Sequence, residues 1–260
     1  MPQNEILTVN MIGAGNVAWH LSKFLFSNGF NIKTIYSFHL NNAKELANFV
    51  QAKAVDNIAE IEPADIVILS LKDSVYQDFI AELPKTNAFV VHTSGALPKE
   101  ILEKISPNYG VLYPFQTFNK IKEITIEQIP FCIEASNDET MRVLENLIKK
   151  LNGTFYHLNF SQREKLHLAG VFACNFTNAL YGLAEDILKN ENIDFDILKP
   201  LIDETAQKIK YLSPKDAQTG PAARQDYNII NKHIALLDND NIRNLYRFLS
   251  QIIQEQQKIR

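Results

Sequence analysis

The residues with the clearest chemical potential form the segment GAGNVA at positions 13–18, which matches the pattern G-x-G-x-x-G/A. In that pattern the first glycine makes a tight turn, the second lets a pyrophosphate approach the backbone, and the third residue keeps a helix close to a strand. Free N–H groups at the start of the helix favour phosphate. We therefore predict a dinucleotide site whose phosphate turn is formed by Gly13, Ala14, Gly15, Asn16 and Val17. A tight turn that serves only the fold is the alternative.

The segment IYSFHLNNAKELA at positions 35–47 bears on which dinucleotide binds. NAD enzymes usually place an acid at the end of the second strand, where it hydrogen-bonds the ribose hydroxyls. No acid lies between Ser37 and Asn42, and Ser37, His39, Asn41 and Asn42 offer hydrogen bonds without charge repulsion. We predict NADP over NAD, with Ser37 in the site, although no arginine is present for the extra phosphate.

Further polar residues follow the later predicted strands, where an open parallel sheet collects its ligands. Leu71 and Lys72 lie at the end of one predicted strand and are predicted to contact the cofactor. Ser94, followed by Gly95, is placed to hydrogen-bond a nicotinamide or a substrate carbonyl, unless the pair is an ordinary turn. His92, at the end of the same strand, is expected to be structural.

A later helical segment carries His167, Val171 and Asn175 at spacings of four, with Asn178 three residues further on, so that these side chains can share one face. We predict His167 as the proton donor, Asn175 as a catalytic hydrogen-bond partner of the substrate, and Asn178 as a substrate contact. A structural histidine on an amphipathic helix is the alternative.

The segment GPAARQD at positions 220–226 supplies two more candidates. Arg224 has a planar fork that suits a carboxylate or phosphate of a substrate. Asp226 is a candidate substrate contact or, alternatively, the N-cap of the next helix.

Short β-type runs alternate with helical patterns in the first part of the chain, which predicts a Rossmann-type, mostly parallel sheet. The predicted strands are residues 6–12, 32–37, 66–71, 88–92, 110–113, 129–134 and 154–157. The predicted helices are residues 16–27, 42–49, 74–82, 98–105, 138–151, 161–188, 200–211, 227–237 and 241–257. We therefore expect an α/β dinucleotide-binding domain at residues 1–158 and an all-helical substrate and dimerisation domain at 159–260.

The first helix of the second domain has its own signals. Ser161-Gln162-Arg163-Glu164 predicts a capping box. A bulky apolar stripe follows at Leu168, Phe172, Phe176, Ala179, Leu180 and Leu183. A second face of small residues, Gly170, Ala173, Cys174 and Thr177, suits close approach of a helix or ligand.

Composition excludes several classes of protein. The 260 residues are 46% hydrophobic and 22% charged, as expected for a soluble globular protein. The net charge of −4 provides no positive field for nucleic acid or an anionic membrane. No signal-peptide pattern is present, and no apolar run approaches the roughly 20 residues of a membrane span. Cys132 and Cys174 lie in apolar runs, which predicts two buried reduced thiols, a cytoplasmic location and no metal site.

Several segments carry a resemblance to known proteins: the glycine turn, LKDSV (71–75), VHTSGAL (91–97), YPFQTF (113–118), LHLAGVFACNF (166–176) and GPAARQD (220–226). With them the chain resembles the 6-phosphogluconate-dehydrogenase-like superfamily. Its first domain looks like those of pyrroline-5-carboxylate reductases and deazaflavin-dependent NADP oxidoreductases. The likeness is greatest to a group of Rossmann-like oxidoreductases whose helical C-terminal domain has no assigned function. It implies a homodimer joined through the helical domain.

Two positions depart from these families. The family pattern usually has His-Pro where this chain has Tyr113-Pro114, so we assign Tyr113 no role from the sequence. Related β-hydroxyacid dehydrogenases have a lysine four residues before an asparagine, at the position of Val171. We expect an NADP-dependent oxidoreductase that reduces a C=O or C=N bond of a small anionic metabolite. The alternatives are a non-catalytic dinucleotide sensor and a homologue that has lost cofactor binding.

Overall fold

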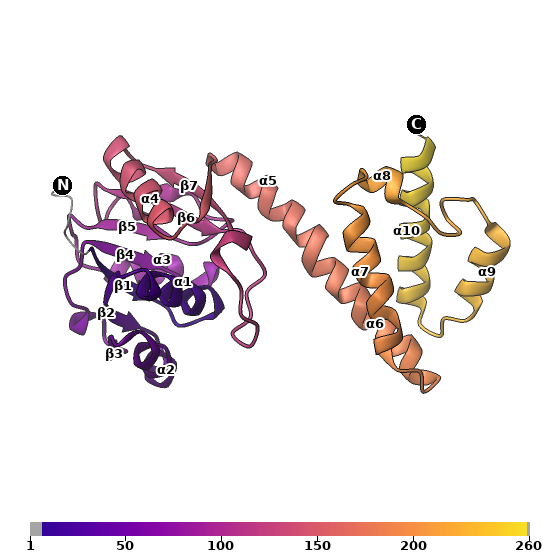
Figure 1. Ribbon diagram of the computed structural model, residues 1–260, viewed down its shortest axis with the longest axis horizontal. Coiled ribbons are helices and arrows are strands. Elements are labelled where there is room, and N and C mark those ends of the chain that lie inside the picture. Colours follow the sequence, from indigo (N-terminus) through magenta and orange to yellow (C-terminus); the bar gives the residue numbers. More distant parts are fainter. Residues whose placement is uncertain (1–6, 259–260) are drawn as a thin grey trace. The chain divides into compact units, whose positions relative to one another are not determined.

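The computed structural model describes residues 7–258, so Ile6, the predicted start of the first strand, lies outside the described residues. The chain forms two compact units, the first ending at Asn178 and the second beginning at Ala179 (Figure 1). The domain boundary predicted at residues 158 and 159 lies where the last strand gives way to a long helix. The division between the compact units falls further along that helix.

The first unit is built on one eight-stranded sheet in the order β3-β2-β1-β4-β5-β6-β7-β8. Every neighbouring pair is parallel except β6 and β7. This confirms the predicted Rossmann-type α/β class. The strands are β1 (Thr8–Ile12), β2 (Asn31–Tyr36), β3 (Lys53–Val55), β4 (Ile66–Leu69), β5 (Phe89–His92), β6 (Tyr109–Pro114), β7 (Pro130–Ala135) and β8 (Thr154–His157). Sequence analysis missed β3 because three residues are too few to show an alternating pattern.

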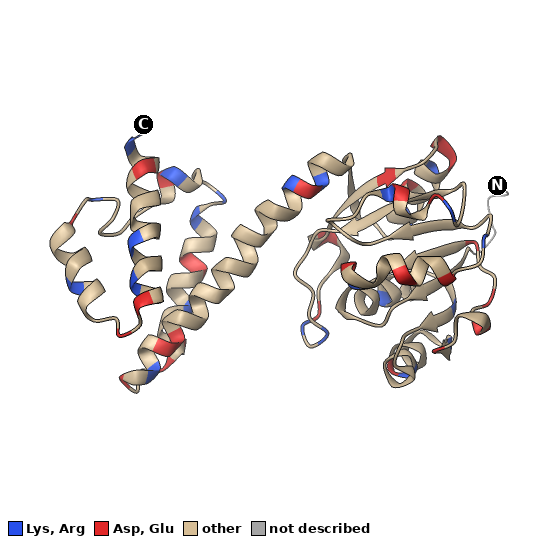
Figure 2. Ribbon diagram, turned by 180° about the vertical axis from the view of Figure 1, so that it is seen from behind, with Lys and Arg blue, Asp and Glu red and all other residues tan. Residues whose placement is uncertain are grey.

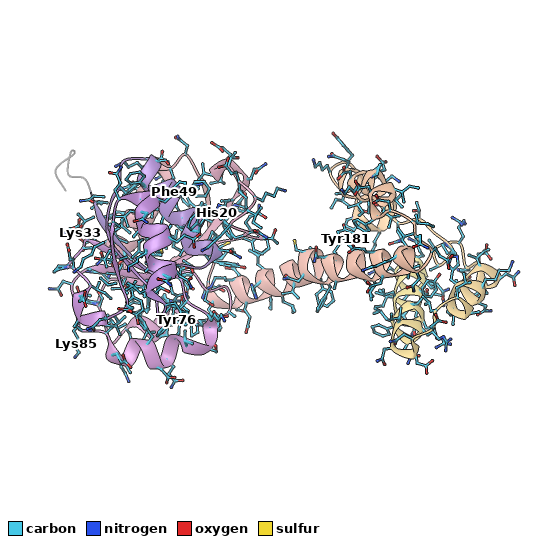
Figure 3. The ribbon with its side chains drawn as sticks, turned by 90° about the horizontal axis from the view of Figure 1, so that it is seen from below. His20, Lys33, Phe49, Tyr76, Lys85 and Tyr181 are labelled. Carbon is cyan, nitrogen blue, oxygen red and sulfur yellow. The ribbon has the colours of Figure 1, made fainter. Side chains whose placement is uncertain are left out.

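Helices cover both faces of the sheet. A larger apolar cluster joins one face to α1, α2 and α4, and a smaller one joins the other face to α3 and η3. Figure 3 accordingly labels His20 of α1 and Phe49 of α2 on one side and Tyr76 of α3 on the other. The helical elements of this unit before residue 159 are α1 (Asn16–Ser27), α2 (Leu40–Val50), η1 (Ile58–Glu60), η2 (Asp73–Val75), α3 (Tyr76–Glu82), η3 (Lys99–Leu102), η4 (Ile126–Gln128) and α4 (Asp138–Lys150).

The capping box of the long helix begins two residues earlier than predicted. Asn159 is the N-cap, its side chain accepts from the Gln162 N–H, and the Gln162 side chain accepts from the Asn159 N–H, both at 3.0 Å. The box assigned to Ser161 and Glu164 is therefore wrong. Asparagine is an equally good cap, and Arg163, which lies inside the predicted box, is fully buried.

The long helix is also not α-helical throughout. It runs as α5 (Phe160–Gly170), a π-helical segment η5 (Val171–Phe176) and α6 (Thr177–Asn190). The Thr177 hydroxyl donates to the Phe172 carbonyl, five residues back, at 3.2 Å. Figure 2 shows no charged residue in the middle of this helix. Cys174 lies there exposed, which corrects the prediction that both cysteines are buried; only Cys132 is buried.

The second unit is entirely helical in its described residues, as predicted. Besides most of α6, it contains η6 (Phe195–Leu198), α7 (Lys199–Lys208), α8 (Pro214–Ala217), α9 (Tyr227–Ala235) and α10 (Asp240–Lys258). Few of its apolar side chains are buried.

Candidate functional site

The glycine turn joins β1 to α1 and is held by its neighbours. The Gly13 N–H donates to the Tyr36 carbonyl at 2.8 Å, and the Ser70 N–H donates to the Ile12 carbonyl at 2.7 Å. Gly13 has φ +118°, and a Cβ there would overlap the Ser70 carbonyl oxygen. The first glycine is therefore required by the backbone itself.

Gly15 differs, because a Cβ there would meet nothing within 4 Å. Gly15 is the N-cap of α1, no side chain caps the helix, and no acid lies in its first turn. The first backbone N–H groups of α1 are therefore uncapped and accessible past Gly15, which suits binding of the phosphates of a dinucleotide. The turn thus has the geometry that a dinucleotide cofactor requires.

A long loop between β6 and β7 packs against this turn. The Asn16 side chain donates to the Phe118 carbonyl at 3.0 Å, and His20 Nε2 donates to the Asn119 carbonyl at 2.9 Å. The side-chain amide of Asn16 is therefore hydrogen-bonded within the protein, and its backbone N–H is the group that can bind a phosphate. Sequence analysis could not find this contact, because it joins residues about a hundred positions apart.

The residues predicted at the ends of β2, β4 and β5 differ in exposure. Ser37 is buried directly after β2, Leu71 is half-buried, and Lys72 is exposed. Ser94 is buried, and its hydroxyl accepts from the N–H groups of Ala96 and Leu97 at 3.0 and 3.2 Å. Ser94 thus forms a hydrogen-bonded turn, while its own O–H remains a possible donor.

His92 is structural, as predicted. It is completely buried, its Nδ1 accepts from the Ser94 N–H at 3.2 Å, and its Nε2 lies 3.3 Å from the Pro98 carbonyl. Burial, with a smaller effect from the Arg163 charge, lowers the pKa of His92 to about 3. The ring is therefore neutral and shapes the turn that carries Ser94.

Tyr113 and His167 form a pair beside that turn. The Tyr113 hydroxyl lies 2.9 Å from His167 Nδ1, although 54 residues separate them in the chain. A Cβ on Gly95 would lie 2.8 Å from both His167 Nδ1 and the Tyr113 ring, so any other residue at this position would displace one of these two side chains. Burial raises the pKa of Tyr113 to about 12, which keeps its hydroxyl protonated at neutral pH. The phenol can donate to Nδ1, and neutral His167 then carries its proton on Nε2.

An ionic cluster around the buried Arg163 holds α5 against the same turn. Arg163, one helical turn before His167, is fully buried and donates to Glu134 Oε2 at 2.6 Å and to the Leu97 carbonyl at 2.5 Å. Lys99 donates to the other oxygen of Glu134 at 2.7 Å. Arg163 thereby joins the helix of His167 to the loop that follows Ser94. Its spacing of four from His167 was the only signal of this role in the sequence.

The π-helical segment affects which residues share a face with His167. A step of four residues is slightly more than one turn of an α-helix and slightly less than one turn of a π-helix. The first step therefore shifts a side chain around the helix axis in one direction, and the second shifts it back. The step from His167 to Val171 lies mainly in the α-helical part, and the step from Val171 to Asn175 lies in the π-helical part. The three side chains therefore stay on one side of the helix. Asn175 and Asn178 are exposed.

The remaining candidates lie in the second unit. Arg224 is exposed, and it follows Gly220, which has φ +104°. Asp226 is the N-cap of α9, and its Oδ1 accepts from the Ile229 N–H at 3.2 Å. The capping alternative for Asp226 is therefore confirmed, while a contact with substrate stays a prediction.

Residues 7–258 contain no group of three or more His, Cys, Asp or Glu side chains arranged to hold a metal ion. Within the same range, no helix is both long and apolar enough to cross a membrane.

Residues 8–94 match the family described as "NADP oxidoreductase coenzyme F420-dependent", and residues 129–253 match a domain of unknown function, DUF2520. A solved "putative NADP oxidoreductase" from Bacteroides fragilis is 44% identical, with a TM-score of 0.90 over 96% of this chain and 98% of that one. No curated protein matches the chain.

Two more distant structures share the fold. A pyrroline-5-carboxylate reductase from Coxiella burnetii is 15% identical, with a TM-score of 0.58 and 98% of each chain covered. A reductive aminase from Aspergillus terreus, solved with NADPH and ethyl levulinate, is 13% identical, with a TM-score of 0.72 over 96% of this chain and 95% of that one. At these identities the likeness is evidence of fold alone.

Proposed function

Because the chain belongs to the family that joins an NADP oxidoreductase domain to DUF2520, we propose that it is an enzyme that reduces a C=O or C=N bond of a small anionic metabolite with NADPH. The observation that carries this proposal is the open, uncapped start of α1 at Gly15, which faces no side chain and presents backbone N–H groups. Leu71 and Lys72 at the end of β4 and Ser94 after β5 extend the cofactor site along the same edge of the sheet.

When bound, NADPH supplies the hydride. We propose that His167 delivers the proton to the nitrogen or oxygen of the reduced bond from Nε2. As this proton leaves, Nδ1 takes the proton of the Tyr113 hydroxyl, so the ring stays neutral, and the phenolate recovers a proton from water. The Tyr113 hydroxyl, 2.9 Å from Nδ1, holds the ring in the tautomer that has this proton. Gly95 keeps both groups close to the Ser94 turn. Asn175, on the same side of the helix, is the proposed hydrogen-bond partner of the substrate.

In the second unit, Arg224 is the proposed partner of the anionic group of the substrate, because its guanidinium fork can bind a carboxylate with two hydrogen bonds. Asn178 and Asp226 are proposed as further substrate contacts. We also propose a homodimer joined through the helical part of the chain. Its support is the row of apolar side chains on the long helix, where Leu168 is 57%, Phe172 63% and Phe176 51% exposed.

The cofactor assignment is tested with Gly15→Val. A branched side chain would fill the approach to the N–H groups, so we expect a folded protein that no longer binds NADPH in calorimetric titration. Gly29→Asn is the matched control, because Gly29 lies in open space beyond the other end of α1, with a positive φ that asparagine tolerates. Unchanged NADPH affinity in folded Gly15→Val would contradict the assignment.

The catalytic assignment is tested on a panel of keto acids and imines. His167→Gln should lower kcat about 100-fold or more, the usual contribution of a general acid, while NADPH affinity is retained. Tyr113→Phe should have a smaller effect on kcat and change its pH profile, because the ring loses the partner that selects its tautomer. If NADPH binds tightly and no member of the panel is reduced, a dinucleotide sensor becomes the better interpretation.

A further inference from the structure

Phe38 is an exposed aromatic ring in the turn between β2 and α2. It is 54% exposed, although it packs edge-on against two buried rings, Tyr36 and Phe79, with centroids 5.7 Å away in both cases. These contacts restrict the ring while half of its surface remains in water. An aromatic ring that is held in place and exposed to solvent is suited to stacking on a flat ligand.

The position of Phe38 relates it to the glycine turn. It lies two residues after Tyr36, whose carbonyl accepts from the Gly13 N–H at 2.8 Å. Ser37 is buried between them, and its hydroxyl accepts from the His39 N–H at 3.3 Å. In dinucleotide-binding sheets the end of the second strand is where the adenosine ribose is held. Phe38 and His39 therefore flank the place that the adenosine end of a cofactor would occupy.

The charges at this turn favour an additional phosphate. No acid or arginine occurs from Ser37 to Asn42, and His39 is the single side chain in that segment that can become a cation. His39 is exposed and forms the N-cap of α2 without a side-chain cap bond. Within this segment, a negatively charged group would thus meet an imidazole and a serine hydroxyl and no carboxylate. Acids of other elements do act nearby, because burial and the charges of Glu82 and Asp56 raise the pKa of Tyr36.

We propose that Phe38 stacks on the adenine ring and that His39 and Ser37 bind the 2′-phosphate, so that this chain selects NADP by an aromatic ring and an imidazole where an arginine would otherwise serve. The inference rests on the proposed binding of NADPH. Phe38 and His39 have different roles in this proposal. Phe38 affects every ligand that contains adenine, whereas His39 affects those with a 2′-phosphate.

The test is calorimetric titration of Phe38→Ala and His39→Ala with four ligands: NADPH, NADH, 2′,5′-ADP and reduced nicotinamide mononucleotide. Phe38→Ala should weaken the first three alike, by about 10- to 100-fold, as expected for a lost base–aromatic stack. His39→Ala should weaken NADPH and 2′,5′-ADP by about 10-fold, as expected for one hydrogen bond to a charged group, and leave NADH unchanged. The mononucleotide, which has no adenosine, should not respond to either change.

Two control variants distinguish loss of the aromatic stack from a general effect on folding. Phe38→Tyr should retain affinity, and Phe49→Ala, which removes a ring of similar exposure from α2, should leave all four ligands unaffected. If NADPH binds but Phe38→Ala has the wild-type affinity, or if His39→Ala weakens NADH as much as NADPH, this inference is wrong and the proposed function stands. If the unaltered protein does not bind NADPH, both are wrong.

Discussion

The two units of the chain differ in how far their apolar and charged side chains are buried. The first unit packs apolar residues of its sheet and helices into two clusters and contains an ionic cluster around the buried Arg163. In the described part of the second unit, Ala222 and Ile230 are the only buried apolar residues, while Leu236 is 79% and Phe248 61% exposed. The first unit therefore has a packed apolar core of its own. The second unit, like the row Leu168, Phe172 and Phe176 at the end of the first, presents apolar side chains that another chain can cover.

The largest expected effect comes from the ionic cluster around Arg163. Glu134→Ala would leave the fully buried Arg163 charge without its carboxylate, so we expect a loss of about 3–5 kcal/mol in the free energy of unfolding, measured in urea. The matched change in the second unit is Glu204→Ala, which removes the exposed partner of Lys208 and should have no measurable effect. Equal small losses from both changes would remove the contrast between the units.

The next prediction concerns the apolar row of the long helix. Phe172→Ser should raise the dissociation constant of the proposed homodimer by about a thousandfold. Each buried phenylalanine contributes about 2 kcal/mol, and a symmetric interface contains two copies of it. Sedimentation or light scattering measures the change. Phe38→Ser, which removes an exposed ring from the turn after β2, is the control and should not alter association. A protein that is monomeric before any substitution would refute the dimer.

A third prediction follows from the neutral, buried His92. Its pKa is about 3 in the folded protein, against an ordinary value of about 6.5, so between these pH values only the unfolded chain takes up the proton. The stabilising contribution is complete above pH 6.5 and falls as the pH decreases toward 3, by about 1.4 kcal/mol per pH unit.

Between pH 7 and pH 5, the original protein should therefore lose about 2 kcal/mol more stability than His92→Asn, which cannot titrate. Urea unfolding at the two pH values gives the difference. A His92→Asn variant with the same pH dependence as the original would mean that His92 is protonated in the folded state.

The smallest expected effect lies at the start of α9. Asp226→Ala should lower stability by about 1 kcal/mol because the Ile229 N–H loses its acceptor, whereas Asp226→Asn should keep the cap. Thermal unfolding of both variants measures the cap. If Asp226→Asn is as stable as the original but loses turnover, Asp226 also contacts substrate. If it retains turnover, the role of this residue is confined to the fold.

The sequence alone determined the features that depend on neighbouring residues. The glycine turn, the bounds of α1 at Asn16 and Ser27, and the strand β8 all follow from local pattern, because turn geometry and side-chain periodicity are properties of a short stretch of chain. The parallel sheet also followed, since alternating strands and helices permit few other arrangements. The lack of an acid after β2 could likewise be seen without a structure.

Only the tertiary structure decided which of these residues act together. The Tyr113–His167 pair joins a strand to a helix 54 residues later, and the sequence had assigned Tyr113 no role. Arg163 was interpreted as part of a capping box, yet its guanidinium is buried between Glu134 and the Leu97 carbonyl. Periodicity shows that a residue faces inward, but its partner is set by packing between segments distant in the chain, and packing also decides which polar groups lose water.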